Sequence, residues 1–236
     1  MSEALWQEVE YGSYDTDLAL WERLAAAAAG PILELGCGVG RVSLALARRG
    51  HQVVGIDSDA EMVSELSGRA ERDGLSLRAE YADAASFDLG ETFALVLAPM
   101  QLLQLLPAHA RRSCLRSVAR HLRPGGLAAF ALVDAGAAGA ADSPPLPDVR
   151  ERNGNVYSSL PLGVVADDDG LVVDRLRQTV DPAGELRERR ESVRLWDLAP
   201  DAVESEGGAA GLRPAGRERI EPSDQHVGST VILLEA

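Results

Sequence analysis

The sequence predicts an α/β protein in which a parallel sheet carries helices on both faces and a small antiparallel sheet is inserted late in the chain. Short apolar runs alternate with helical periodicity from residue 31 to residue 133, which is typical of parallel strands joined by helices. From 149 to 196, strand-like runs follow one another with only turns between them, which indicates antiparallel pairing. A chain of 236 residues, 46% of them hydrophobic, can fold as one domain with such an insertion.

Apolar periodicity divides the first half of the chain into strands and helices. Short apolar runs predict strands at 31–36, 52–57, 75–83, 93–99 and 126–134. A period near 3.6 predicts helices at 39–49, 60–72 and 107–122, and the proline and glycines at 124–126 are expected to stop the last of them. The alanine run 25–29 is also expected to be helical. Right-handed crossovers between the parallel strands follow from the chirality of the chain.

The pattern changes after Asp134. The stretch 135–147 is rich in small residues and proline and is expected to be a loop. The strand-like runs of the insertion lie at 156–164, 171–180 and 185–196, with turns at 167–170 and 181–184. A short helix near 199–210 and two strands at 212–221 and 228–236 are expected to close the chain.

Composition and charge exclude several classes of function. The formal net charge is −14 at pH 7, which argues against a nucleic-acid substrate because such binding normally needs a basic face. No apolar run approaches the ~18 residues that a membrane span needs, and the N-terminal stretch lacks the basic region of a signal peptide. We therefore expect a cytoplasmic protein with no membrane partner. The two cysteines, Cys37 and Cys114, indicate neither a disulfide framework nor a metal site.

A glycine-rich turn follows the first strand, in the stretch Ile-Leu-Glu-Leu-Gly-Cys-Gly-Val-Gly-Arg at 32–41. A dinucleotide turn counted from Gly36 would place Arg41 where a small residue is needed for close packing of helix on strand. If the dinucleotide turn is counted from Gly38 instead, its sixth position is Ser43, which fits that pattern only in part. A phosphate-binding P-loop requires a lysine, and the chain has none.

The same turn resembles the first motif of the class I S-adenosylmethionine (SAM) methyltransferases. The residues that match are Glu34, Gly36, Cys37, Gly38 and Gly40. The resemblance spans about residues 30–134 and extends more loosely to the C-terminus. It implies a Rossmann-like seven-stranded sheet with the first five strands parallel and the last antiparallel, and a loop that passes under the methionine and ribose parts of SAM. Glycine suits such a loop because no side chain blocks the approach of the backbone.

Two aspartates at strand ends support this resemblance. Asp57 ends the second predicted strand, where a carboxylate can accept hydrogen bonds from both ribose hydroxyls. Asp83 ends the third strand, and in the resembled family that residue and the N–H of the next one, here Ala84, meet the adenine ring. Taken singly, either aspartate can instead cap a following helix. The resemblance also assigns Ser58, Met62 and Ala98 to the cofactor site, Met62 as an apolar contact to adenine.

The N-terminal segment is rich in aromatic residues. Trp6, Tyr11, Tyr14 and Trp21 are four of the ten aromatic residues of the chain. In the resembled family a tyrosine-bearing segment often covers the cofactor pocket and excludes water during methyl transfer. Tyr14 is the candidate for this role. The alternative is an aromatic contact that fastens the first helix to the core.

The substrate side is less well defined by the sequence. The fourth strand ends in Ala-Pro-Met-Gln at 98–101, without the Asn-Pro-Pro signature of the methyltransferases that act on DNA or protein glutamine. Gln101 either hydrogen-bonds a substrate or begins a helix. Tyr11 and Tyr157 are further candidates for substrate contact. No general base stands out among the four histidines, and no catalytic residue is assigned, which favours an amine or an acidic phenol or enol as the acceptor.

Basic side chains alternate on two strands of the insertion. The arginines concerned are Arg175, Arg177, Arg187 and Arg189, and Thr179 shares the strand face of the first two. They could bind a carboxylate or phosphate of the substrate. The favoured interpretation is a solvated face balanced by nearby acidic residues.

Together these features predict a methyltransferase that uses SAM to methylate N or O of a small molecule and releases S-adenosylhomocysteine. The expected parts are an N-terminal helix and lid at 1–30, a SAM-binding core at 31–134, a loop and antiparallel insertion at 135–196, and strands that complete the sheet at 197–236. The insertion is a candidate surface for a homodimer. The alternatives are an NAD(P)-dependent oxidoreductase and a SAM-binding protein without catalytic activity.

Overall fold

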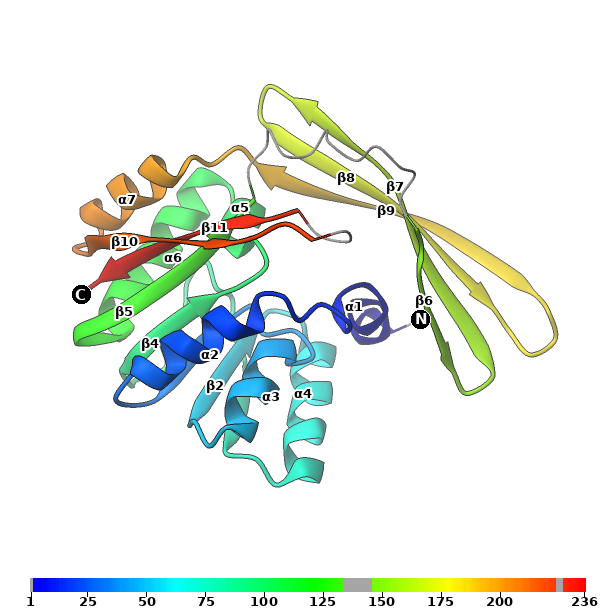
Figure 1. Ribbon diagram of the computed structural model, residues 1–236, viewed down its shortest axis with the longest axis horizontal. Helices are drawn as coiled ribbons and strands as arrows, with labels where there is room; N and C mark the ends of the chain where they lie inside the picture. Colours follow the sequence, from blue (N-terminus) through cyan, green and yellow to red (C-terminus); the bar gives the residue numbers. More distant parts are fainter. Residues whose placement is uncertain (1, 134–145, 224–226) are drawn as a thin grey trace.

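The structure, a computed structural model, describes residues 2–133, 146–223 and 227–236. Its main body is a seven-stranded sheet with helices on both faces, and a four-stranded antiparallel sheet extends to one side (Figure 1). The main sheet has the strand order β10-β11-β5-β4-β1-β2-β3, and the inserted sheet has the order β6-β7-β8-β9. The predicted fold class is therefore confirmed.

The strands and helices have the following bounds. The main sheet contains β1 (Ile32–Leu35), β2 (Val53–Asp57), β3 (Leu77–Tyr81), β4 (Phe93–Ala98), β5 (Leu122–Leu132), β10 (Arg213–Ile220) and β11 (Ser229–Glu235). The inserted sheet contains β6 (Asp148–Arg152), β7 (Asn155–Asp167), β8 (Gly170–Val180) and β9 (Leu186–Trp196). The helices are α1 (Glu3–Tyr11), α2 (Leu18–Ala27), α3 (Arg41–Arg48), α4 (Ala60–Asp73), α5 (Leu102–Leu105), α6 (Ala108–His121) and α7 (Pro200–Ala209).

Strand direction in the main sheet sets the place of the site. Strands β1 to β5 pair in parallel, and β11 is antiparallel to both β5 and β10. The chain reverses its direction of winding at β1, whose neighbours are β2 and β4. In open parallel sheets, ligands bind beyond the carboxyl ends of the strands at this switch point.

Two apolar layers cover the main sheet. Phe93 and Phe130 pack with α6 on one face, and Trp21 of α2 and Leu46 of α3 pack on the other. Successive residues of a strand point to opposite faces, so Ile32 joins one layer while its neighbour in the chain joins the other. This double burial explains the nearly continuous apolar runs of the central strands.

Several boundaries differ from those expected. The helix α2 ends at Ala27, so the alanine run is only partly helical. The helix α6 ends at His121 and β5 starts at Leu122, so the proline and glycines at 124–126 lie within β5 rather than at the helix end. The helix α5 has Gln101 as its N-cap, so the alternative that Gln101 begins a helix is confirmed. The short strand β6 was not expected. Most of 135–147 and all of His226 lie outside the described residues.

Helix α1 lies between the main body and the inserted sheet (Figure 1). It contacts α4 on one side and β6 and β7 on the other. Its N-cap is Ser2, whose hydroxyl accepts a hydrogen bond from the backbone N–H of Leu5. Among the described residues, none of the helices has the length and apolar character needed to cross a membrane.

Candidate functional site

The three glycines of the turn after β1 are present for three different physical reasons. All have positive φ: +65° at Gly36, +52° at Gly38 and +92° at Gly40. Gly36 is exposed, and a Cβ there would approach only the flexible Leu102 side chain. The backbone at Gly36 is therefore open to close approach by a ligand.

The other two glycines make room for side chains of this chain. A Cβ at Gly38 would overlap the carboxamide of Gln7 on α1. A Cβ at Gly40 would overlap Leu66 of α4, so this glycine permits close packing between helices. The turn is thus held by two neighbouring helices and keeps one open face.

Asp57, at the end of β2, is bonded to the glycine turn. Its Oδ2 accepts the backbone N–H of Gly38 at 2.8 Å, and its Oδ1 accepts that of Asp59 at 3.0 Å. The side chain that caps α4 is Asp59, which accepts the N–H of Glu61. The alternative that Asp57 caps this helix is therefore wrong. A carboxylate has about four acceptor sites, so both oxygens can still accept a hydroxyl.

Asp83 follows β3 and is exposed. Its Oδ1 accepts the N–H of Ala85 at 2.8 Å, which forms a local turn. Residues 84–92 contain no helix, so the capping alternative is wrong here as well. Ala84 is buried beside it. The turn after β1, Asp57 and Asp83 lie at the carboxyl ends of three adjacent strands.

Glu34 and Cys37 are buried beneath the turn. The Glu34 carboxyl accepts a hydrogen bond from the Ser43 hydroxyl, and burial raises the pKa of Glu34 to about 7. The Cys37 side chain packs against Gly55, and burial raises the pKa of this thiol well above its usual range. Both side chains support the turn from below, and the buried thiol is unsuited to nucleophilic catalysis.

Three further predicted residues lie near this edge of the sheet. Ser58 is exposed after β2, and Met62 is half-buried on the first turns of α4. Ala98 is buried at the end of β4. Met62 can therefore offer an apolar surface to a ligand that is bound at the ends of β2 and β3.

Tyr14 lies in the segment between α1 and α2 and is buried. The Arg41 guanidinium lies 4.8 Å from the centre of its ring and also donates to the Tyr14 carbonyl oxygen at 3.1 Å. Arg41 further pairs with Asp17, which accepts the indole N–H of Trp21. Burial, with Asp17 nearby, raises the pKa of Tyr14 to about 12. Arg41, the residue that disfavours a dinucleotide-binding turn, thus holds the N-terminal segment against the core.

The three predicted substrate residues are spread over the molecule. Tyr11 ends α1 and is half-buried, and desolvation raises the pKa of its hydroxyl. Gln101 has φ +62°, precedes α5 and donates to the Ser229 hydroxyl at 3.3 Å, which joins the end of β4 to β11. Tyr157 packs edge to face on Trp6, with ring centres 5.7 Å apart.

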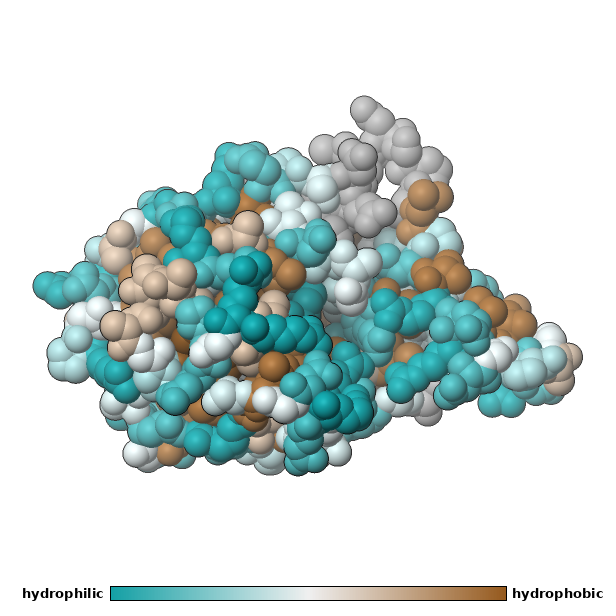
Figure 2. Space-filling view, turned by 60° about the horizontal axis from the view of Figure 1, so that its bottom comes forward, coloured by the Kyte–Doolittle hydropathy of each residue, from teal (hydrophilic) through white to brown (hydrophobic). Residues whose placement is uncertain are grey.

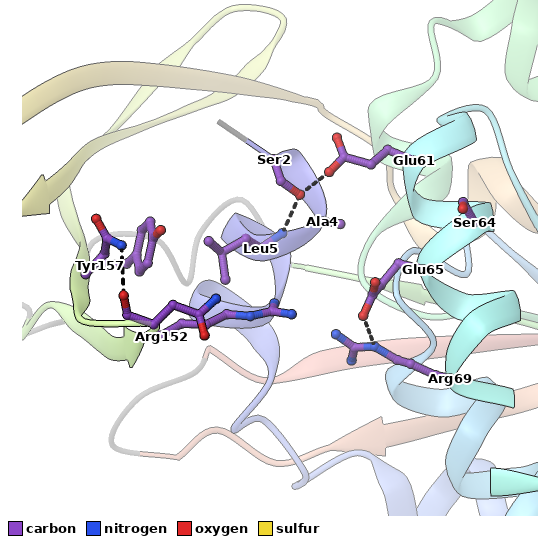
Figure 3. Close-up of a pocket in the computed structure, with 11 residues that line it drawn as sticks. Ser2, Ala4, Leu5, Glu61, Ser64, Glu65, Arg69, Arg152 and Tyr157 are labelled. Carbon is purple, nitrogen blue, oxygen red and sulfur yellow. Dashed lines mark hydrogen bonds and ion pairs between the residues drawn. The ribbon is translucent and has the colours of Figure 1, made fainter. Parts of the chain in front are cut away.

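A cavity of about 350 Å³ lies between α1, α4 and the hairpin of β6 and β7 (Figure 3). Ser2 and Leu5 of α1 lie between Tyr157 on one wall and Glu61 and Arg69 on the other. Of the predicted site residues, Tyr157 alone lines this cavity. Neither Asp57 nor Asp83 lines the cavity.

Comparison with known proteins identifies the central part of the chain. Residues 32–126 match the family model described as a methyltransferase domain. We call this matched segment the methyltransferase domain, after the family model to which it is similar. It begins with β1 and ends within β5, so it contains the glycine turn and both aspartates.

One curated relative of the methyltransferase domain is a 23S rRNA (uracil(1939)-C(5))-methyltransferase RlmD of Azoarcus sp., 38% identical over 76 residues. That match covers 32% of this chain and 18% of the relative. The chain spans between 14% and 21% of the length of the first three curated relatives that it matches.

Solved structures match over nearly the whole chain. The sugar N-methyltransferase KedS8 of Streptoalloteichus sp. has a TM-score of 0.78 at 19% identity, covering 98% of this chain and 92% of that one. The amino pentose methyltransferase CalS10 of Micromonospora echinaspora has a TM-score of 0.73 at 18% identity, covering 99% and 95%. The chain therefore shares its fold with these two methyltransferases, in agreement with the resemblance.

Two contacts around the methyltransferase domain were not anticipated from the sequence. Gln7 was not singled out, although its Oε1 accepts the N–H of Val39 in the glycine turn at 2.6 Å. The favoured interpretation of the arginines on β8 as a solvated face is wrong for Arg175 and Arg177. Arg177 is buried and donates to Glu10 of α1 at 2.7 and 3.0 Å. No periodicity signals these contacts, because Gln7 lies 32 residues from Val39 and Arg177 lies 167 residues from Glu10.

Proposed function

We propose that the protein is a SAM-dependent methyltransferase that transfers a methyl group to N or O of a small molecule and releases S-adenosylhomocysteine. The observation that carries this proposal is the placement of the glycine turn, Asp57 and Asp83 at the carboxyl ends of the adjacent strands β1, β2 and β3. This edge is also the switch point of the sheet.

The residues present fit the cofactor. Gly36 leaves open backbone for the methionine part, Asp57 retains acceptor sites for the ribose hydroxyls, and the exposed Asp83 can accept from the adenine amino group. When bound, SAM supplies an activated methyl group on its sulfonium. The chain then has to align an acceptor atom with the methyl–sulfur axis and exclude water.

The lid and the insertion serve those two tasks. We assign residues 1–30 to a segment that covers the cofactor and 135–196 to an insertion that borders the acceptor. The buried Tyr14, fixed by Arg41, favours a closed position of this segment over the turn. The core at 31–134 binds the cofactor, and 197–236 completes the sheet.

A small molecule is favoured over RNA as the acceptor. The full-length likeness to KedS8 includes the inserted sheet, whereas the likeness to the rRNA enzyme is confined to 76 residues. The net charge of −14 disfavours an anionic polymer. His121 is buried and bonded to backbone groups, which disfavours it as a general base. An amine acceptor needs only to arrive neutral, so this arrangement favours N-methylation.

The inserted sheet also offers a surface for a second copy of the chain. Its outer face, opposite Arg175 and Arg177, carries a row of exposed apolar side chains that is visible on the right in Figure 2. The row consists of Val149, Val156, Val165, Val180 and Leu186. We propose that the protein forms a homodimer through this face. We also assign it to the cytoplasm. Sedimentation velocity should give the dimer mass, and Val165→Asp should reduce it to that of the monomer.

Thermal unfolding with added ligands tests the cofactor. A ligand at ~100 times its Kd should stabilise the folded state by roughly 2.7 kcal/mol. SAM and S-adenosylhomocysteine should each raise the midpoint, while NAD and NADP should leave it unchanged. Asp57→Ala and Asp83→Ala should reduce the shift, and Asp88→Ala, at an exposed turn away from the glycine turn, should retain it.

The same experiment separates the two competing functions. A shift with the nicotinamide ligands alone would identify an oxidoreductase and overturn the proposal. A shift with SAM but no S-adenosylhomocysteine formed across a panel of amines and phenols would identify a SAM-binding protein without turnover.

A further inference from the structure

The glycine turn is contacted from above by a residue of α1. Gln7 Oε1 accepts the backbone N–H of Val39 at 2.6 Å. The neighbouring N–H, that of Gly38, is bonded to Asp57 at 2.8 Å. Two consecutive amides of the turn are therefore fixed by side chains from two different elements, one of which is the helix that covers the domain.

Gly38 is required for this contact. A Cβ at this position would overlap both polar atoms of the Gln7 carboxamide, so the absence of a side chain creates the space that Gln7 fills. Gly36, by contrast, stays exposed. The middle glycine of the turn thus accommodates the chain's own N-terminal helix, while the first leaves backbone open.

The opposite side of α1 is bound to the inserted sheet. Glu10 is 3% exposed and receives two hydrogen bonds from Arg177 and one from the Ser159 hydroxyl at 2.8 Å. Glu3 also pairs with Arg177, whose guanidinium lies 5.3 Å from the centre of the Trp6 ring. Burial makes these charged contacts costly to break, so α1 is bound more firmly to the inserted sheet than to the turn.

We propose that Gln7 is a cofactor-positioning residue: its carboxamide holds the glycine turn in the shape that receives SAM and links that turn, through α1, to the inserted sheet. The inference rests on the proposed function. Gln7 acts through the Val39 N–H and the backbone conformation of Gly38. Loss of the hydrogen bond should release the turn and weaken cofactor binding while the core stays folded.

Calorimetric binding of S-adenosylhomocysteine tests this without any acceptor. Gln7→Ala should raise its Kd about tenfold, the effect of losing one well-placed hydrogen bond. Gln7→Met keeps the length of the side chain but has no carbonyl acceptor, so it should raise the Kd by a similar factor. Gln52→Ala, at an exposed position before β2, should bind as the unaltered protein does. The exchange rate of the Val39 amide, followed by NMR without ligand, should rise in both Gln7 variants and stay unchanged in the control.

The outcomes separate the two proposals. Failure of the unaltered protein to bind S-adenosylhomocysteine or SAM overturns the proposed function, and with it the role of Gln7. Binding by the unaltered protein that persists at full strength in Gln7→Ala overturns the role of Gln7 alone. Weak binding by Gln7→Ala with full binding by Gln7→Met also overturns it, since packing rather than the hydrogen bond would then be responsible. A fall in both variants with faster Val39 exchange supports it.

Discussion

The main sheet and the inserted sheet of this protein are stabilised in opposite ways. In the main sheet, β1 is buried throughout and β4 nearly so, and apolar side chains cover both faces. In the inserted sheet, the face toward α1 carries buried charged groups, while the outer face exposes valines and leucines. Apolar burial is non-directional, but a buried ion pair depends on one partner at one position.

The difference means that the inserted sheet depends on a distant part of the chain. Its arginines are neutralised by carboxylates of α1, as in the pairing of Arg177 with Glu3 and Glu10. The main sheet forms its apolar layers with α2, which directly precedes β1, and with helices that follow its own strands. Variants that remove a charge should therefore affect the two sheets differently.

The largest effect is expected from Arg177→Ala. It leaves Glu10 buried without its bidentate partner, which should cost about 3–5 kcal/mol. Hydrogen exchange should show lost protection in α1 and the inserted sheet with the main sheet unchanged. The double change Glu10→Leu with Arg177→Met removes both charges and should recover most of the stability in urea unfolding. Equal loss of protection in both sheets would contradict the separate dependence described above.

A second effect concerns the one buried carboxyl of β1. Burial raises the pKa of Glu34 from its ordinary value near 4.5 to about 7, so between these values the folded state holds a proton that the unfolded state has lost. The free energy of unfolding should therefore fall as pH rises from 4.5 to 7, by up to about 3 kcal/mol, and stay level above.

Urea unfolding at pH 5 and pH 8 measures this directly. Glu34→Gln should remove that part of the pH dependence and be the more stable protein at pH 8. Glu71 is exposed on α4, so Glu71→Gln should leave the pH dependence of the free energy of unfolding as it is in the unaltered protein. A slope that persists in Glu34→Gln would show that other groups cause it.

A smaller effect is expected from Gly38→Ala. Both Gly38 and Gly50 have positive φ, but nothing lies within 4 Å of a Cβ at Gly50. Gly50→Ala should cost roughly 1–2 kcal/mol from the left-handed backbone alone. Gly38→Ala should cost about 1 kcal/mol more because it also displaces Gln7 from its hydrogen bond. That excess should disappear when Gln7→Ala is combined with Gly38→Ala, and its persistence would mean that another contact is responsible.

The sequence was sufficient for the main sheet and insufficient for the contacts of α1. A strand such as β4 can be recognised from its six consecutive apolar, mostly buried residues. Parallel strands bring their carboxyl ends to one edge of the sheet, so Asp57 and Asp83 could be placed at that edge from the sequence. Whether these residues bind SAM stays a prediction. Gln7 meets Val39 across 32 residues and Arg177 meets Glu10 across 167, and neither separation leaves a periodic signal.

The same limit explains the error on β8. Alternation correctly placed Arg175 and Arg177 on one face, but charged residues on a strand face usually meet solvent. Only the packing of α1 on that face shows that their partners are carboxylates of the chain itself. The strand β6 was missed because it has only five residues, four of them charged, which gives no apolar alternation.

The smallest effect is expected from Arg194→Ala, on the same sheet as Arg177. Arg194 pairs with Asp167 through two hydrogen bonds and lies 5.5 Å from the centre of the Trp196 ring, but the pair is exposed to solvent. Exposed pairs gain little because water and salt screen them, so the urea midpoint should not change measurably. Arg177 and Arg194 lie on the same sheet and both pair with carboxylates, so the two variants differ mainly in how deeply the ion pair is buried. A difference in their stability can therefore be attributed to that burial. If Arg194→Ala lost as much stability as Arg177→Ala, the stability of the inserted sheet would depend on its ion pairs in general and not on its contact with α1.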